Sequence, residues 1–316
     1  MKAMVIDAFG GPERIRAAEI PAPEPGPREV LIALGCTSVN PVDWKIREGM
    51  LADMFPHAFP LIPGWDAAGS VTAVGPGVTG FRIGDRVFAY CRKPEIRFGT
   101  YCEFVAVPES AVALIPGSLG FAEAATIPLA GLTAWQSLFD AAKLSAGETI
   151  LIHAGSGGVG SLAIQLARHA GATVYTTARA VNHDYVTGLG ANAAIDYAKQ
   201  NFVDVLRARE PGGIDVVLDT IGGHVQQRSY RVLRKGGRLV SIISIPDADE
   251  ARPYDVRTAF VFVAPDGEQL RRIAELIESG AVRPPAFEVM RLEDAAKAQE
   301  RSRAGHVRGK IVLRIR

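Results

Sequence analysis

The sequence predicts an α/β protein with two domains, a small barrel-like domain of short strands and a domain built on a doubly wound parallel sheet. Its 316 residues are long for a single core. Before residue 108, strand-like runs are short and are separated by turn signals such as Gly75-Pro76-Gly77. After about Phe121, nearly all-apolar strands alternate with helices, which is typical of a parallel sheet covered on both faces.

The first part of the chain has the pattern of β structure, with a hairpin signal at Gly10-Gly11-Pro12. Strands are expected over 1–7, 29–34, 69–74, 86–90 and 101–107. In the second part, we expect helices over 121–125, 131–142, 203–209 and 225–233, and strands over 150–154, 173–177, 193–197, 215–219 and 238–243. The chain then continues with a strand-like run over 260–263, helices over 267–280 and 292–302, and a strand over 309–315.

The most specific motif is glycine-rich and lies between a strand and a helix. An apolar run over 149–154 leads directly into Gly155-x-Gly157-x-x-Gly160, and a helical pattern follows at once. The first glycine permits a sharp turn, the second lets the backbone approach a pyrophosphate, and the third lets the helix pack close to the strand. The helix N-terminus offers free N–H groups to phosphates. We therefore predict that a dinucleotide contacts Ser156, Gly157, Gly158, Val159 and Gly160.

The residues after the next strand indicate which dinucleotide is bound. An NAD site would have Asp or Glu here to hold the ribose 2′-hydroxyl, but the next acid along the chain is Asp184. Arg179 follows the strand instead, with His183 close behind. A guanidinium can hold the extra 2′-phosphate of NADP in a fork, although Arg179 could equally be a solvated loop charge. The sequence therefore favours NADP(H).

Composition limits the class of partner. The formal net charge is +1 and no long basic run occurs, so we expect no nucleic-acid or anionic membrane partner. Because the sequence shows no leader and no apolar stretch of bilayer length, we expect a cytoplasmic location and no membrane contact. The three cysteines, Cys36, Cys91 and Cys102, form no C-x-x-C pair, which argues against a disulfide framework and a cysteine-rich zinc lobe.

Several segments follow a known family pattern in the same order along the chain. They are 38–49 (S-V-N-P-x-D-x-x-x-R-x-G), 63–69 (P-G-x-D-x-A-G), 84–87 (G-D-R-V), 154–160 (A-x-x-G-G-V-G) and 309–313 (G-K-I-V-L). The chain thereby resembles the zinc-independent quinone oxidoreductase (zeta-crystallin-like) branch of the medium-chain dehydrogenase/reductase superfamily. The resemblance implies a GroES-like β-barrel catalytic domain over 1–121 and 283–316, a Rossmann NADP-binding domain over 122–282, and a homodimer.

The chain departs from the zinc enzymes of this superfamily, which hold catalytic zinc with Cys, His and Cys. The resemblance places Asn40 and Trp65 at the first two ligand positions, and the third falls in 127–130, which contains no cysteine. An indole has no lone pair for a metal, and an amide is a poor zinc ligand. We therefore predict no zinc and no other metal site.

The resemblance implies hydride transfer from NADPH to a quinone or to the β-carbon of an enone, where the developing oxyanion needs donors and a proton. It implies catalytic roles for three residues. Asn40 would orient the nicotinamide ribose or donate to the substrate oxygen, with capping of the turn before Pro41 as the alternative. Lys45 would donate a proton or contact phosphate, or be a solvated helix lysine. Thr133 would face the nicotinamide, or merely pack in a helix.

The resemblance also implies further cofactor contacts. Tyr197 is expected beside the 2′-phosphate or the adenine, and Gly222 close to the cofactor. Phe262 and Val263 are expected where the backbone meets the nicotinamide amide, and Lys310 at the pyrophosphate. Packing alone could also explain Tyr197 and the aromatic residues of 260–263.

Two other functions stay open at this point. One is a 2-enoyl-thioester reductase acting on an acyl-CoA or a carrier-bound substrate, favoured if Lys45, Arg47, Arg92 and Lys93 form a basic entrance. The other is a structural or binding protein that retains NADPH affinity without turnover. The intact motifs favour an enzyme that reduces a small-molecule quinone or enone.

Overall fold

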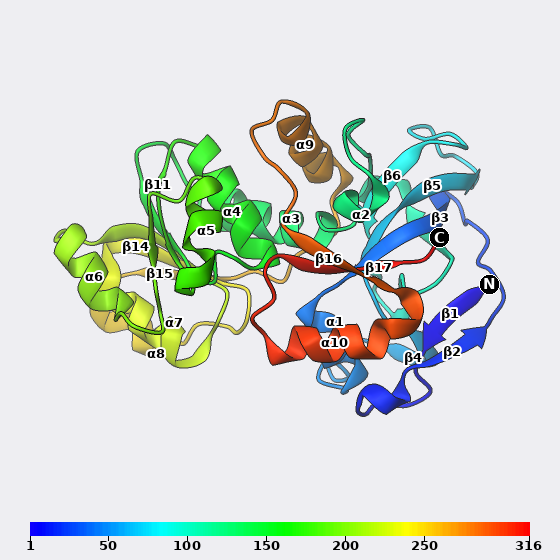
Figure 1. Cartoon of the computed structure of the whole chain (residues 1–316), viewed down its shortest axis with the longest axis horizontal. Coiled ribbons are helices and arrows are strands. Elements are labelled where there is room, and N and C mark those ends of the chain that lie inside the picture. Colours follow the sequence, from blue (N-terminus) through cyan, green and yellow to red (C-terminus); the bar gives the residue numbers. More distant parts are fainter. The chain divides into compact units, whose positions relative to one another are not determined.

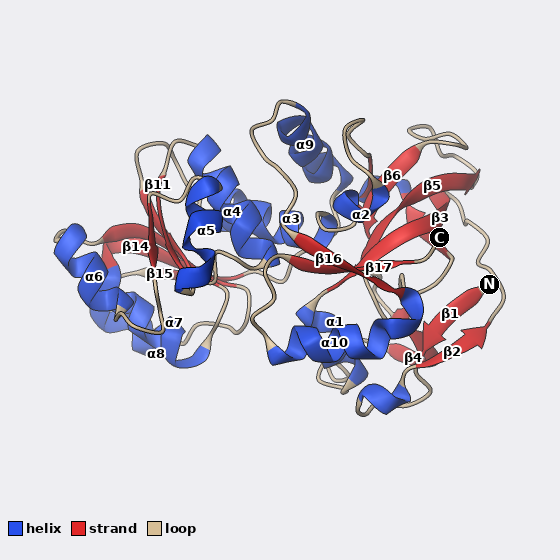
Figure 2. Ribbon diagram, viewed as in Figure 1, coloured by secondary structure: helices blue, strands red, loops and turns tan.

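The computed structural model describes residues 1–316, and its chain divides into two compact units. Unit 1 comprises Met1–Leu132, Ala264–Gly280 and Pro284–Arg316, and unit 2 comprises Thr133–Val263 and Ala281–Arg283. Figure 1 traces the chain through both units, and Figure 2 shows that strands and helices occur in each. The predicted α/β fold with two sheet-based parts is confirmed.

Unit 2 is built on a six-stranded sheet in which all strands run parallel. Its strands are β10 (Thr149–Ile152), β11 (Thr173–Thr177), β12 (Ala193–Ile195), β13 (Ile214–Asp219), β14 (Leu233–Ser241) and β15 (Arg257–Phe260). The order across the sheet is β12-β11-β10-β13-β14-β15, which is the doubly wound order with its reversal at β10. Ligands of such sheets bind outside the carboxyl ends of the strands at that reversal.

Helices cover both faces of this sheet (Figure 1). On one side lie α4 (Gly158–His169) and α5 (His183–Gly188), and on the other lie α6 (Phe202–Arg209), α7 (Gly223–Ser229) and α8 (Ala248–Ala251). Because both faces are covered, the central strands β10, β11 and β13 are almost wholly buried, which explains the largely apolar sequences of β10 and β13. Helix α3 (Pro128–Trp135) continues as a π-helix over Gln136–Ala141.

Unit 1 contains a seven-stranded sheet ordered β16-β17-β3-β5-β6-β9, with β8 also paired to β3. These strands are β3 (Glu29–Val39), β5 (Asp66–Val74), β6 (Arg86–Tyr90), β8 (Phe104–Pro108), β9 (Val112–Leu114), β16 (Phe287–Arg291) and β17 (Lys310–Arg314). Two further pairs are β1 (Lys2–Val5) with β2 (Arg16–Glu19) and β4 (His57–Ile62) with β7 (Ile96–Phe98). The helices are α1 (Pro41–Arg47), α2 (Phe121–Ala124), α9 (Gly267–Glu278) and α10 (Ala295–Ala304).

Three features differ from the sequence-based expectations. The strand expected over 29–34 continues to Val39, and the strand-like run over 260–263 leaves the sheet after Phe260. Helix α9 packs on β9 of unit 1, where a Cβ on Gly267 would lie 2.5 Å from the carbonyl oxygen of Val112. The division into compact units falls after Leu132 and near residue 264. The domain boundaries at 121/122 and 282/283 stay a prediction.

Candidate functional site

The glycine-rich loop of unit 2 connects β10 to α4 at the reversal point of the sheet. The left-handed backbone conformation of this turn falls on Ala154, whose φ is 49°, and not on Gly155. The sequence-based assignment of the sharp turn to the first glycine was therefore off by one residue. Gly155 is required for another reason, because a Cβ there would lie 2.0 Å from the Thr176 hydroxyl oxygen of β11.

The other two glycines of the motif have different surroundings. A Cβ on Gly160 would lie 2.4 Å from the Ala154 carbonyl oxygen, so this glycine permits close packing of α4 on the turn, as predicted. A Cβ on Gly157 would meet only that same oxygen, at 3.3 Å. Gly157 is the N-cap of the 12-residue helix α4, and the first N–H groups of the helix have no partner within it. Phosphates bind in this geometry.

A hydrogen bond joins the glycine-rich loop to the segment after β11. The Asn182 side-chain amide donates to the Ser156 hydroxyl at 3.2 Å, and the Asn182 backbone N–H donates to the Arg179 carbonyl at 2.8 Å. Arg179 itself is exposed and stands at the carboxyl end of β11. Ser156 and Arg179, both predicted cofactor contacts, are therefore brought to one edge of the sheet.

His183 has a different arrangement from Arg179. Its Nε2 lies 3.2 Å from the Ala178 carbonyl, so this nitrogen carries the proton and donates to the backbone. The ring is partly buried at the start of α5. The structure thus gives His183 a role in holding the turn, while its predicted cofactor contact stays a prediction.

Tyr197 and Gly222 lie beyond the carboxyl ends of β12 and β13. Tyr197 is 46% exposed. Gly222 has a φ of 79°, and its N–H donates to Asp219 Oδ1 at 2.8 Å. The Asp219 carboxylate, which the sequence reasoning missed, is fully buried and also accepts from Ile221 N–H, from Gln226 and from the Ser241 hydroxyl. The signal in the sequence that could have pointed to Asp219 is an acidic residue at the carboxyl end of a largely apolar strand.

The remaining predicted cofactor contacts of unit 2 follow β15. Phe262 is partly buried and Val263 is buried, and the preceding Val261 donates its N–H to the Ser241 carbonyl at 2.9 Å. Both residues lie outside the strand in which the sequence placed them. Thr133 is buried in α3, at the start of the residues assigned to unit 2.

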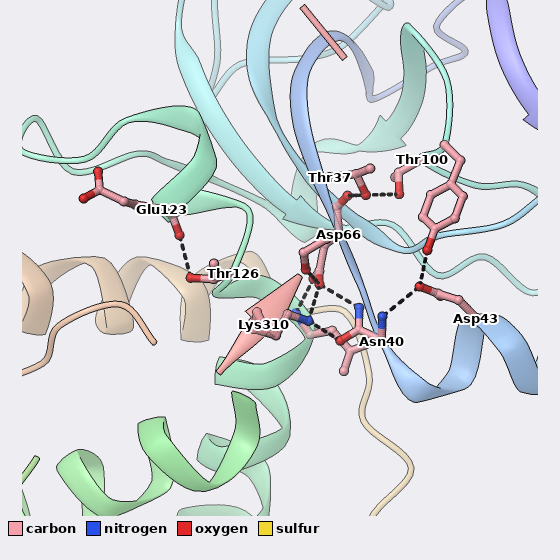
Figure 3. Close-up of polar contacts among 11 residues, drawn as sticks. Thr37, Asn40, Asp43, Asp66, Thr100, Glu123, Thr126 and Lys310 are labelled. Carbon is pink, nitrogen blue, oxygen red and sulfur yellow. Dashed lines mark hydrogen bonds and ion pairs between the residues drawn. The ribbon is translucent and has the colours of Figure 1, made fainter. Parts of the chain in front are cut away.

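In unit 1, three side chains distant in sequence form a buried polar cluster, which we call the Asn40–Asp66–Lys310 cluster (Figure 3). The Lys310 ammonium donates to Asn40 Oδ1 and lies 3.2 Å from Asp66 Oδ2. Asn40 Nδ2 donates to the same Asp66 oxygen at 2.7 Å. All three residues are at most 5% exposed. The expected contact of Lys310 with the pyrophosphate stays a prediction, and the structure gives the ammonium protein partners instead.

A second acid lies beside this cluster, at the right of Figure 3. Asp43 Oδ2 accepts from the Asn40 backbone N–H at 2.8 Å and from the Tyr101 hydroxyl at 2.9 Å. Its other oxygen is buried without a partner. Burial raises the pKa of Asp43 to about 7, and the bond from the Asn40 backbone opposes that rise. Asp43 therefore holds the backbone of the loop before α1, and the Asn40 side chain is left to bond to Asp66 and Lys310.

Comparison with known proteins decides the family. Residues 26–117 match the family model of the alcohol dehydrogenase GroES-like domain, and residues 189–313 match that of zinc-binding dehydrogenase. The chloroplast envelope quinone oxidoreductase homolog of Arabidopsis thaliana is 34% identical over 99% of this chain and 98% of its own length. The chain belongs to the quinone oxidoreductase branch of the medium-chain dehydrogenase/reductase superfamily.

Two other members of the family are similarly close. The NADPH-dependent alkenal/one oxidoreductase of Arabidopsis thaliana chloroplasts is 36% identical over 99% of this chain and 79% of its own length. The structure of the quinone oxidoreductase from Coxiella burnetii matches with a TM-score of 0.90 and 33% identity, covering 100% of this chain and 99% of that one. The predicted superfamily, branch and GroES-like and Rossmann-type architecture are confirmed.

Zinc, which one matching family name mentions, does not suit the side chains found here. Asn40 is already bonded to Lys310 and Asp66, and Trp65 is buried with its ring 5.9 Å from that of Tyr90. A buried ammonium in the same cluster would repel a cation. Nowhere in residues 1–316 do three His, Cys, Asp or Glu side chains gather so that they could hold a metal ion.

The basic residues of α1 differ in their surroundings. Lys45 is about half buried, with its ammonium 5.7 Å from the centre of the Trp44 ring, and burial lowers its pKa. Arg47 is fully buried and bonds to Gln299, Glu48 and Glu300. Arg47 therefore cannot line an exposed basic entrance, contrary to what the enoyl-thioester alternative required of it. None of the helices combines the length and apolar character that crossing a bilayer requires.

Proposed function

We propose that this protein is an NADPH-dependent reductase that transfers hydride to a quinone or to the β-carbon of an α,β-unsaturated carbonyl. The observation that carries the proposal is the glycine-rich loop at the reversal of the unit 2 sheet, tied through Asn182 to the turn that presents Arg179. The alkenal/one and quinone oxidoreductase relatives support both the reaction class and the cofactor.

The cofactor fits the residues of unit 2. The N–H groups of Gly158, Val159 and Gly160 would hold the pyrophosphate, and the lack of a side chain at Gly157 leaves room for it. Arg179 would bind the 2′-phosphate, and Tyr197 would lie beside the adenosine. When bound, NADPH supplies the hydride.

In unit 1, Asn40 would donate a hydrogen bond to the reactants, and Lys45 would hold a proton or contact a phosphate. Because the side chains at the expected ligand positions do not suit zinc, the developing oxyanion of the substrate would be stabilised by hydrogen bonds from the protein. We accordingly propose that turnover needs no zinc and survives treatment with a chelator. Thr133 would contact the nicotinamide. A cytoplasmic location and a homodimer are proposed by analogy with the family alone.

Substitution of Arg179 tests the cofactor assignment. Arg179→Ala should weaken NADPH binding roughly 10- to 100-fold, because a charged hydrogen bond to the 2′-phosphate is lost, and should leave NADH binding unchanged. Titration of each cofactor, followed by fluorescence, gives the two dissociation constants. Arg168→Ala, an exposed arginine in the last turn of α4, is the matched control. Equal weakening for both cofactors would contradict the assignment.

The acceptor class is tested by NADPH oxidation with 1,2-naphthoquinone, an alkenal and crotonyl-CoA. We expect turnover with the quinone or the alkenal to exceed that with the thioester, since Arg47 is buried and takes no part in an entrance. Preference for crotonyl-CoA would favour the enoyl-thioester reductase. Tight NADPH binding without turnover on any acceptor would favour a binding protein.

A further inference from the structure

The orientation of the Asn40 side-chain amide is fixed by two charges of opposite sign. Its oxygen faces the Lys310 ammonium, and its nitrogen faces the Asp66 carboxylate at 2.7 Å. A half-turn of the amide would set its N–H groups against the ammonium and its oxygen against the carboxylate. Both contacts would then be repulsive, because an ammonium only donates and a carboxylate only accepts.

Asp66 is anchored without help from Lys310. Its Oδ1 accepts the Leu129 backbone N–H at 2.7 Å, and its Oδ2 accepts the Ser38 hydroxyl at 2.6 Å (Figure 3 shows its setting). The Asn40 backbone is anchored separately, through the Asp43 carboxylate. With Asp66 and the Asn40 backbone held in place, only the rotation of the Asn40 amide is left to be fixed. Lys310 is the only group that donates a hydrogen bond to the amide oxygen.

The fixed amide retains one unused donor. An amide nitrogen carries two N–H bonds, and Asp66 is the only acceptor that Asn40 Nδ2 has in residues 1–316. Its bond to a carboxylate holds the nitrogen firmly, so the second N–H has a defined direction.

We infer that Lys310 is a positioning residue, whose buried ammonium holds the Asn40 amide in the one orientation that offers its second N–H to the reactants. The inference rests on the proposed function, because it takes Asn40 to donate to the cofactor or substrate. It assigns Lys310 a role other than contact with the cofactor pyrophosphate.

The test combines kinetics with a direct observation of the amide. In Lys310→Met, kcat for quinone or enone reduction should fall on the order of 10- to 100-fold, while KM for NADPH changes less than about threefold. Lys310→Arg, which keeps a buried cationic donor, should recover part of the lost kcat. Lys297→Met, on the exposed side of α10, is the control and should leave both constants unchanged.

The amide itself can be followed because the sequence contains only four asparagines, Asn40, Asn182, Asn192 and Asn201. Labelling of asparagine side chains with ¹⁵N gives four N–H₂ pairs in an NMR spectrum. We expect Lys310→Met to shift the Asn40 pair and to speed its exchange with solvent, and to leave the other three pairs in place. Should this variant not fold, Lys310→Met with Asp66→Ala removes both charges, keeps four asparagines, and should likewise shift the Asn40 pair.

The outcomes separate this inference from the proposed function. A raised KM for NADPH with unchanged kcat and an unmoved Asn40 pair would overturn the inference and place Lys310 at the pyrophosphate. Absence of wild-type activity on every acceptor would contradict the proposed function. In that case, an Asn40 pair that moves in Lys310→Met still supports the positioning of the amide, and one that stays still overturns it.

Discussion

The glycine-rich loop of unit 2 and the Asn40–Asp66–Lys310 cluster of unit 1 are built in opposite ways. The loop uses backbone groups of consecutive residues and has no side chain at Gly155, Gly157 or Gly160. The cluster uses side chains from residues 40, 66 and 310, all buried and bonded to one another. The loop depends on the absence of side chains, whereas the cluster depends on the charges of Asp66 and Lys310 and on the amide of Asn40.

The largest expected effect falls on the cluster. Asp66→Ala should lower the free energy of unfolding by about 3–5 kcal/mol, because Lys310 keeps a buried charge without its partner. Urea denaturation followed by circular dichroism measures this loss. The control is Asp249→Ala, which breaks the exposed ion pair with Arg252 and should cost less than about 1 kcal/mol. Similar losses in both variants would mean that the cluster is not a charge-dependent structure.

The next effect compares two glycines of the loop. Gly160→Ala should destabilise the protein by about 1–3 kcal/mol, because its methyl group would collide with the Ala154 carbonyl. Gly157→Ala should destabilise less than Gly160→Ala, because its methyl group would lie 3.3 Å from the Ala154 carbonyl oxygen, and it should weaken NADPH binding, because the methyl group would occupy space beside the phosphate. Thermal unfolding and cofactor titration of both variants measure the two effects. The reverse pattern would contradict the division of roles between these glycines.

The last prediction is a dependence of stability on pH, which is the smallest effect when it is compared over a single pH unit. Burial raises the pKa of Asp43 from 3.8 to about 7, so the folded protein retains a proton that the unfolded chain releases. Between these two values, stability falls as pH rises, by up to about 1.4 kcal/mol per pH unit, and it levels off above the folded pKa. Asp43→Asn should remove this slope. Unfolding of both proteins in urea at several pH values gives the difference, and parallel pH profiles would show that Asp43 does not titrate there.

The contrast between the two regions explains what the sequence could predict. The strand–turn–helix around Gly155 is a local pattern, so its place at the sheet reversal was predictable, as were the two sheet types and the family. The turn residue was displaced to Ala154 because the contact of Gly155 with Thr176 is set by packing across strands. The role of each predicted site residue in binding or catalysis stays a prediction.

The cluster in unit 1 could not be predicted in the same way. Lys310 lies 244 positions from Asp66, and no periodicity links the two. Arg47 similarly looked like a surface charge, because its partners Gln299 and Glu300 lie more than 250 residues away on α10. Pairing of β17 with β3 brings Lys310 beside Asn40, so these contacts depend on the complete fold.

The position of β17 between β16 and β3 has a consequence for biosynthesis. A ribosome makes β3 early and β17 only after the whole of unit 2 has been synthesised. Until then, the Cys36–Val39 stretch of β3 lacks the neighbour that β17 provides, and the Asp66 carboxylate lacks its counter-ion. An unpaired strand edge invites association between nascent chains. Completion of unit 1 therefore waits until β17 has been made, and a product that stops short of Lys310 would retain an unpaired edge of β3.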